Sequence, residues 1–353
     1  MKYFYLTPGV VALLFDKNDF ATNQPKLIDR FNRFPQKLRL SITDKCNMHC
    51  VYCMPSGKIS LYPKNEILSY EEIQRLATIF VGLGVEKIRL TGGEPLVRPE
   101  IEKLISGLSK IAGLKSLGMT TNGLLFSQKA AQLKAAGLQS INISLDTLKP
   151  DRFKSITRVD GFSQVLSSLQ TAREEGFEVK INTVIIRGQN DDELVDFAQF
   201  ASNTGYPVRF IEFMPLDGSH IWDLSLVVTK EEMLRRLYQN GIEVLPLNNR
   251  LSDPARLYSF KGRGGSIGFI PSMSEPFCGA CDRVRLTSDG KFLTCLFEKP
   301  SNDIKQLLRM GKSDKVIADY LIDCYRKKPL GLVGLLEHKP IRSGMNLMNT
   351  IGG

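Results

Sequence analysis

Short apolar stretches alternate with amphipathic helical patterns from Leu38 to about Pro215. The apolar stretches predict six strands, over 38–44, 86–91, 114–122, 140–146, 178–186 and 207–213. Helical patterns lie between them near 71–82, 100–110, 127–136, 162–175 and 191–203, several of them beginning at a cap residue such as Ser69, Ser127 or Asp191. A run of βα units of this kind predicts a parallel sheet.

In each of the first five predicted strands, one face is apolar and the other is polar. A doubly wound sheet with helices on both faces would show continuous apolar runs instead. The pattern therefore favours a barrel with helices outside and a wet interior that holds a polar ligand, although ordinary polar residues at strand ends remain an alternative. Six strands would leave the barrel incomplete, with a gap at its side. The polar positions include Arg39, Arg89, Thr120, Asn142, Ser144, Lys180 and Asn182.

The regular alternation of strands and helices ends at about Asp217. We expect a helix around 229–239, short segments over 242–247, 255–260 and 266–271, and further helices near 301–310 and 313–327. The fold class is therefore α/β, an incomplete parallel (β/α)6 barrel over residues 31–225. A C-terminal α+β domain over 226–353, with antiparallel strands, would close the barrel opening. Residues 1–30 are expected to form a weakly ordered extension with no motif, and the sequence assigns no role to residues 1–26.

Composition excludes several classes of protein. Hydrophobic residues make up 42% of the chain and charged residues 24%, which suits a globular core. The apolar run Gly9–Phe15 is far shorter than the roughly 20 residues that span a bilayer, so we expect no membrane association and, by default, a cytoplasmic location. The net charge of +10 permits nucleic-acid binding. The cations are dispersed through strands instead of forming a stripe with interleaved aromatic residues, so no nucleic-acid partner is expected.

Six of the seven cysteines fall into two groups of three, and only Cys324, a typical core residue, stands alone. In a cytosolic chain, cysteines this close together are more often metal ligands than disulfides. The first group follows the first strand with the spacing C-x3-C-x2-C, and the second has the spacing C-x2-C-x13-C. The two groups are Cys46, Cys50 and Cys53, and Cys278, Cys281 and Cys295.

Three thiolates on one loop can hold three irons of a [4Fe–4S] cluster and leave the fourth iron open for reaction. A structural zinc site needs four ligands, and His49, directly before Cys50, is poorly placed as the fourth. For the second group an incomplete zinc ribbon remains an alternative. Arg283 and Arg285 follow Cys281 and, on an extended segment, project to one side, where guanidinium groups suit phosphate oxygens.

These motifs resemble those of known enzymes. The first cysteine group, with an aromatic residue before its last cysteine, resembles the signature of the radical S-adenosylmethionine (SAM) superfamily, and Thr91–Pro95 resembles its SAM-binding GGEP motif. The wider set resembles the GTP 3′,8-cyclase family of molybdenum cofactor biosynthesis over residues 27–353. The further matching segments are Leu38–Asp44, Thr120–Gly123, Asn142–Asp146, Arg209–Met214, Cys281–Arg285 and Ile351–Gly353.

The resemblance implies two [4Fe–4S] clusters, the first on Cys46, Cys50 and Cys53 with SAM, the second on Cys278, Cys281 and Cys295 with its open iron facing guanine. It implies SAM contacts at Tyr52, Gly93, Ser144 and Met214. It implies GTP contacts at Arg39, Arg89, Thr120, Lys180, Arg283, Val284 and Arg285, with Arg209 a further candidate. It implies catalytic roles for Arg283, Arg285, Gly352 and Gly353, the last two threading into the active site.

The positions of Arg209 and Met214 on the sixth strand differ in parity, so both face inward only if the strand ends or bulges between them.

The implied activity is the radical cyclisation of GTP to 3′,8-cyclo-7,8-dihydro-GTP. The implied partners are GTP, an unidentified one-electron donor, a downstream cyclic pyranopterin monophosphate synthase and a second copy in a homodimer. One alternative is another two-cluster radical SAM enzyme, such as a peptide maturase, although those usually carry more C-terminal cysteines. Another is a zinc-stabilised nucleic-acid-binding protein.

Overall fold

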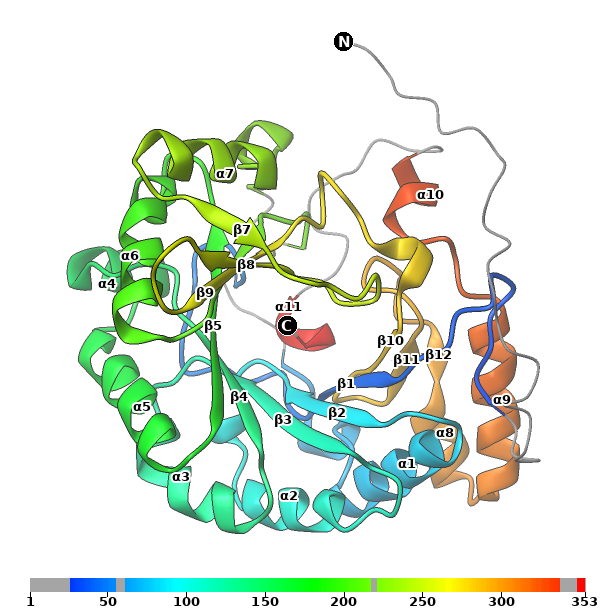
Figure 1. Cartoon of the computed structure of the whole chain (residues 1–353). Coiled ribbons are helices and arrows are strands. Elements are labelled where there is room, and N and C mark those ends of the chain that lie inside the picture. Colours follow the sequence, from blue (N-terminus) through cyan, green and yellow to red (C-terminus); the bar gives the residue numbers. More distant parts are fainter. Residues whose placement is uncertain (1–25, 55–60, 217–220, 337–347, 353) are drawn as a thin grey trace.

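The computed structural model describes residues 26–54, 61–216, 221–336 and 348–352. Six parallel strands form a curved sheet, with consecutive strands hydrogen-bonded as neighbours (Figure 1). These strands are β1 (Lys37–Ser41), β2 (Lys87–Thr91), β3 (Ser116–Thr121), β4 (Ser140–Ser144), β5 (Glu178–Ile185) and β6 (Val208–Glu212). The predicted strands extend past most of these carboxyl ends, where the chain instead forms the loops of the site.

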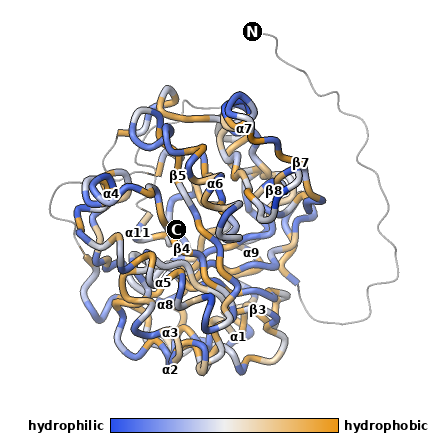
Figure 2. Tube along the Cα trace, turned by 60° about the vertical axis from the view of Figure 1, so that its left-hand side comes forward, coloured by the Kyte–Doolittle hydropathy of each residue, from blue (hydrophilic) through white to orange (hydrophobic). Residues whose placement is uncertain are grey.

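Helices cover the outside of the barrel in the order that the sequence predicts. They are α1 (Tyr70–Gly82), α2 (Ile101–Ser109), α3 (Phe126–Ala135), α5 (Phe162–Glu174) and α6 (Leu194–Thr204). A short helix after β4, α4 (Pro150–Thr157), was not predicted. The peripheral helices α4 and α7 (Lys230–Gln239) carry many hydrophilic residues, as Figure 2 shows, because one side of each faces water.

The predicted helix starts differ in their outcome. Ser69 caps α1 in a reciprocal arrangement with Glu72, so that prediction is confirmed. Ser127 is not a cap, because α3 begins one residue earlier and the Ser127 N–H donates to Ser168 Oγ at 3.0 Å. Asp191 starts a 3-10 turn, η3 (Asp191–Glu193), that precedes α6.

The register of the sheet brings the polar positions together. Arg39 lies opposite Arg89 on β2, and Asn182 lies opposite both Ser144 and Arg209. The alternate positions on the same strands, such as Leu40, are buried in one continuous apolar core beneath the helices. The prediction of an apolar outer face and a polar inner face is therefore confirmed.

The C-terminal strands form two antiparallel sets, but these also extend the barrel. Strand β9 pairs in parallel with β6, and β10 pairs in parallel with β1, so each barrel edge gains a strand. The expected antiparallel strands are present, and the two parallel pairings are additional. These form because the edges of an open barrel present unpaired N–H and C=O groups that β9 and β10 satisfy. The two sets are β7 (Val244–Pro246), β8 (Arg256–Phe260) and β9 (Ser266–Ile270), and β10 (Arg283–Leu286), β11 (Lys291–Leu293) and β12 (Asn302–Asp303).

Within the described ranges, no hydrogen bonds join β7 to β12, so the twelve-stranded sheet stays open. The remaining helices are α8 (Ile304–Arg309), α9 (Asp314–Arg326), α10 (Leu332–Leu336) and α11 (Met348–Ile351). Figure 1 shows α11 in the middle of the barrel opening. The domain boundary at 225/226 stays a prediction.

The start of the chain is better ordered than expected from residue 26 onward. Leu27 is buried in the core, and Asp29 forms a buried ion pair with Arg33 at 2.6 Å. These residues belong to the packed structure and not to a loose extension; residues 1–25 lie outside the described residues. No helix in the part of the chain that the structure describes is long and apolar enough to cross a membrane.

Candidate active site

One cavity of about 320 Å³ lies inside the barrel, and both cysteine triplets line it. The triplets are more than 200 positions apart in the chain, so the fold alone brings them to one space. The other predicted site residues along its walls are Arg39, Tyr52, Gly93, Thr120, Ser144, Arg209, Met214, Arg283 and Arg285.

The loop that carries the first triplet is held against α4. The N–H groups of His49 and Val51 donate to the carbonyls of Thr157 and Ile156, both at 3.0 Å. The His49 side chain is exposed and does not line the cavity, so it is not a fourth ligand for these thiols. The unpredicted helix α4 therefore supports the cysteine loop.

The donor set suits an iron–sulfur cluster. Burial raises the pKa of the Cys46 thiol to about 11 and that of Cys53 to about 12, so both need a cationic centre to become thiolates. No group of three His, Cys, Asp or Glu side chains among the described residues is arranged to hold a metal ion. Three thiols spread around one cavity are consistent with a multi-atom cluster.

Two glycines after β2 allow the chain to pass directly over this loop. A Cβ on Gly93 would lie 2.3 Å from the carbonyl oxygen of Lys45, and one on Gly92 would lie 2.5 Å from that of Thr43. Their close approach is fixed by N–H···O bonds of 2.8 Å, from Gly93 to Thr43 and from Glu94 to Lys45. Only glycine fits at both positions.

Glu94 joins the loops after β2 and β3. Its buried carboxylate accepts hydrogen bonds from Thr121 Oγ1 (2.8 Å) and from the N–H groups of Asn122 (2.7 Å) and Leu96 (3.0 Å). Burial raises the pKa of Glu94 to about 7 despite these donors. Asn122 in turn directs its side-chain amide at the Cys46 sulfur, 3.8 Å away.

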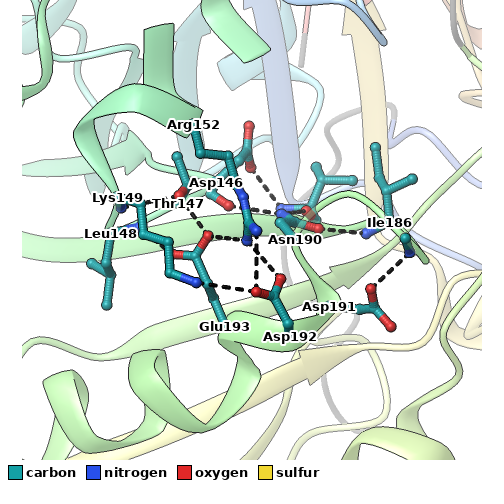
Figure 3. Close-up of polar contacts among 12 residues, drawn as sticks. Asp146, Thr147, Leu148, Lys149, Arg152, Ile186, Asn190, Asp191, Asp192 and Glu193 are labelled. Atoms are coloured by element: carbon teal, nitrogen blue, oxygen red, sulfur yellow. Dashed lines mark hydrogen bonds and ion pairs between the residues drawn. The ribbon is translucent and has the colours of Figure 1, made fainter. Parts of the chain in front are cut away.

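A second buried carboxylate, Asp146, lies behind the cysteine loop. It accepts hydrogen bonds from the Tyr52 hydroxyl and from the Val184 N–H (2.8 Å), and burial raises its pKa to about 6. Figure 3 shows how the loop after β4 is tied down: Asn190 donates to the Asp146 carbonyl at 2.7 Å. Glu193 accepts from Thr147 Oγ1, the Leu148 N–H and Arg152.

The second triplet is assembled by the turn η5 (Cys278–Ala280) and the β10–β11 hairpin. The hairpin pairs Arg285 with Leu293, which returns the chain to Cys295 beside Cys281. Arg33 donates to the Cys278 carbonyl at 2.7 Å, so the ordered N-terminal residues also support this site. Burial raises the pKa of Cys295 to about 11.

Cations without acidic partners lie around the cavity. Arg39, Arg209 and Arg285 form no ion pair with any carboxylate of the described residues, and burial lowers the pKa of each, that of Arg285 to about 10. For Arg39 the neighbouring arginines, Arg285 first among them, lower it further. The charges of Glu178 and Asp253 only partly offset the effect of burial on the pKa of Arg209. The remaining excess of buried positive charge is unfavourable, so this arrangement calls for an anionic ligand.

Buried polar atoms without partners point to the same conclusion. Of the nine such side-chain atoms found within the described residues, five belong to residues that line this cavity. Unsatisfied buried groups are rare in folded proteins, and ligands commonly satisfy them. The five atoms are Thr91 Oγ1, Thr120 Oγ1, Asn142 Oδ1, Asn182 Oδ1 and Arg209 Nε.

Three predicted contact residues do not line the cavity. The Val284 side chain is buried in the apolar core, so only its backbone could face a ligand there. Arg89 donates to the Met119 carbonyl and to Ser140 Oγ, and Lys180 pairs with Glu178. Arg89 and Lys180 lie one inward-facing position nearer the amino ends of their strands than the lining residues Thr91 and Asn182.

Strand β6 resolves the parity conflict noted in the sequence. It ends at Glu212, so Arg209 lies within the strand and Met214 in the loop that follows, and both line the cavity.

The C-terminal residues reach the site at the end of α11. The Arg285 guanidinium donates to the Gly352 carbonyl, and Asn349 donates to the Asp44 carbonyl at 3.2 Å. Gly352 has φ +79°, and a Cβ there would lie 2.1 Å from Thr91 Oγ1. Gly353 lies outside the described residues. Cys324 is partly buried against the core and does not line the cavity.

Sequence reasoning missed the carboxylates that hold the loops. Asp146 belongs to a recognised motif, but nothing in its spacing shows that it pairs with Tyr52. Glu193 is one of three consecutive acids, Asp191–Glu193, which are typical of an exposed helix start. Only the third acid is buried, because it contacts the loop after β4. That loop is distant in sequence, so the local sequence around Glu193 gives no sign of the contact.

Family models match two consecutive parts of the chain. Residues 40–201 match the radical SAM superfamily, and residues 206–332 match the family described as Molybdenum Cofactor Synthesis C.

Curated relatives match most of the chain. A protein named GTP 3′,8-cyclase from Thermodesulfovibrio yellowstonii is 43% identical over 92% of this chain and 99% of its own length. The mitochondrial GTP 3′,8-cyclase of Arabidopsis thaliana is 42% identical over 88% of this chain and 80% of its own length. Human molybdenum cofactor biosynthesis protein 1 is 44% identical over 82% of this chain but 45% of its own length.

Among solved structures, Streptococcus suis SuiB bound to S-adenosylmethionine is similar with a TM-score of 0.55, covering 89% of this chain and 76% of that one. Its 15% sequence identity shows a shared fold alone.

Proposed function

Because this chain belongs to the GTP 3′,8-cyclase family of the radical SAM superfamily, we propose that it cyclises GTP to 3′,8-cyclo-7,8-dihydro-GTP, the first step of molybdenum cofactor biosynthesis. The observation that carries the proposal is one cavity that contains two separate thiol triplets together with unpaired arginines. A SAM-derived radical and the GTP ribose must meet without diffusing apart, and one enclosed space provides that proximity.

At one end of the cavity, Cys46, Cys50 and Cys53 would hold a [4Fe–4S] cluster. When bound, this cluster supplies the electron that cleaves SAM to methionine and a 5′-deoxyadenosyl radical. Gly93 brings backbone groups to the ligand where any side chain would collide with the cysteine loop. The remaining proposed SAM contacts are Tyr52, Ser144 and Met214, all of which line the cavity.

The arginines on the walls of the cavity would bind the substrate's phosphates. Arg39, Arg209 and Arg285 are desolvated and form no ion pair with a carboxylate of the described residues, so a triphosphate would supply the negative charge that they lack. The unpartnered oxygens of Thr120, Asn142 and Asn182 offer hydrogen bonds to ribose or base. Arg89 and Lys180 lie one layer deeper than the lining residues. They would attract the phosphates by their positive charge and not by direct contact.

Cys278, Cys281 and Cys295 would hold a second [4Fe–4S] cluster, which would help to bind the guanine of the substrate. Arg283 and Arg285 reach the cavity from β10 directly after these thiols. The contact between Arg285 and the Gly352 carbonyl supports a role for the C-terminal glycines beside the same substrate.

The proposal extends to three partners, of which the reaction itself requires only a one-electron donor to reduce the first cluster. The other two are a cyclic pyranopterin monophosphate synthase that consumes the product and a second copy of the chain in a homodimer. We also propose a cytoplasmic location, where thiols stay reduced and can serve as cluster ligands. For the peptide-maturase alternative, the only support is a shared fold with SuiB, whose structure bound to a precursor peptide is similar with a TM-score of 0.55 and 14% sequence identity.

Anaerobic reconstitution tests the proposal. We expect about eight irons per chain from two [4Fe–4S] clusters, and 5′-deoxyadenosine that accumulates with SAM and reductant only when GTP is present. Two zinc ions in place of iron, or equal 5′-deoxyadenosine with and without GTP, would refute it.

A further inference from the structure

A buried lysine that does not line the cavity contacts the second cysteine triplet. Lys328 follows α9 and is 2% exposed, although it carries a charged side chain. Its Nζ donates to the Arg283 carbonyl at 2.9 Å and points at the Cys281 sulfur at 3.7 Å. Unlike Arg283 and Arg285, it does not line the cavity.

No carboxylate in the described ranges neutralises this ammonium. Asp282, adjacent to Cys281, pairs instead with Lys37 at 2.9 Å and Arg283 at 3.6 Å. The Tyr325 ring lies 5.1 Å from the Lys328 nitrogen and adds only a weak cation–π contact. The principal anion available to Lys328 is therefore the thiolate that Cys281 becomes when it binds metal.

The turn around Lys328 is fixed against the same triplet at two further points. Arg33 donates to the carbonyls of Cys278 and Pro329, both at 2.7 Å, and so bridges the turn to the cysteine segment. A Cβ on Gly331 would lie 2.7 Å from the Cys278 sulfur, so this residue must remain glycine for the turn to pack there. These contacts fix the position of the turn, and therefore of the Lys328 side chain, relative to Cys281.

We propose that Lys328 is a positioning residue that donates a charge-assisted hydrogen bond to the Cys281 ligand and thereby raises the reduction potential of the second cluster. The inference rests on the second cluster of the proposed function. A fixed positive charge beside a ligand sulfur favours the cluster state with one more electron. Hydrogen bonds in which a partner is charged are also roughly twice as strong as neutral ones.

The electrostatics of the free thiol are consistent with this role. Burial raises the pKa of Cys281, but the charges of Lys328 and then Arg283 outweigh it, so the pKa lies below its ordinary value. Cys295, in the same triplet, has its pKa raised to about 11.

The test is a redox titration of the reconstituted holoenzyme followed by electron paramagnetic resonance. The second cluster is assigned as the signal that persists when Cys50 is replaced by Ser. In K328M we expect the equilibrium constant for its one-electron reduction to fall about tenfold, a shift of about 59 mV to lower potential. K328R should restore most of the potential, and K328Q, which keeps a donor without the charge, should lie between.

Lys327 provides a matched control, because it is the adjacent residue, carries the same charge and is exposed. K327M should leave the potential unchanged. An unchanged potential in both K328M and K328Q, with full iron content, would overturn the inference. A wild-type protein with about four irons and no signal in the Cys50→Ser variant would instead refute the second cluster and the proposed function.

Discussion

Replacing Gly352 by Ala should disable the cyclisation while sparing the clusters. The added Cβ would lie 2.1 Å from Thr91 Oγ1 and 3.3 Å from the Ser41 Cβ, whereas real Cβ contacts below 3.0 Å are essentially never seen. The backbone at Gly352 has φ +79°, a conformation that costs a non-glycine residue about 1–2 kcal/mol. The tail must therefore move, and Arg285 loses the carbonyl that it holds.

The backbone strain alone lowers the docked population of the tail by a factor of about 5–30, and the collision with Thr91 adds to that. We expect GTP consumption by G352A to fall more than about tenfold, since 1.4 kcal/mol corresponds to a factor of ten. The assay follows GTP loss and product by chromatography, with iron content measured on the same samples. Iron content should match that of the wild type.

Gly311 is the matched control, because it also has positive φ (+70°) but no atom would lie within 4 Å of a Cβ added there. G311A imposes similar backbone strain at a surface turn and should leave turnover close to that of the wild type. If G352A consumed GTP as fast as G311A, the account of the C-terminal glycine would be refuted.

Replacing Arg285 by Ala should abolish cyclisation and weaken GTP binding at least about tenfold while both clusters remain, because the phosphate site loses a desolvated cation. Calorimetric titration with GTP measures the affinity, and an unchanged affinity would contradict the prediction. Glu94 has a folded-state pKa of about 7 against an ordinary 4.5, so its contribution to stability is complete below about pH 4.5 and is lost as pH rises through about 7. The melting temperature of E94Q apoprotein should accordingly depend less on pH over that window than that of the wild type. Equal pH dependence of the two melting temperatures would contradict the raised pKa of Glu94. Replacing Glu193 by Ala strands the Thr147 hydroxyl and the Leu148 N–H and should lower the free energy of unfolding by about 1–3 kcal/mol in denaturant titration. Asp192→Ala, at the exposed neighbouring acid, should have a much smaller effect, and equal losses would show that burial of Glu193 is unimportant.

The alternation of side chains in the strands was enough to predict the barrel and its polar interior. Arg39 and Leu40 are adjacent in sequence and lie on opposite faces, and this local rule holds for each parallel strand. The cysteine spacing similarly identified both triplets, because metal chemistry restricts ligand spacing more strongly than packing does.

The parts that were not predicted depend on contacts between distant segments. Strands β9 and β10 join the barrel because its edges are open, which no pattern within 266–270 or 283–286 reveals. The site contributions of Asp146, Glu193 and Lys328 arise from neighbours that the fold supplies. Val284 is the opposite case: it belongs to a motif of the site, but the fold places its side chain in the apolar core.

The central claim is that the cavity brings a SAM-derived radical to the ribose of GTP. Its most direct test is anaerobic turnover with GTP that carries deuterium at the 3′ carbon, followed by mass spectrometry of the 5′-deoxyadenosine. The account predicts one deuterium in that product and its formation only with GTP. Undeuterated 5′-deoxyadenosine formed at the same rate without GTP, with GTP recovered intact, would contradict it.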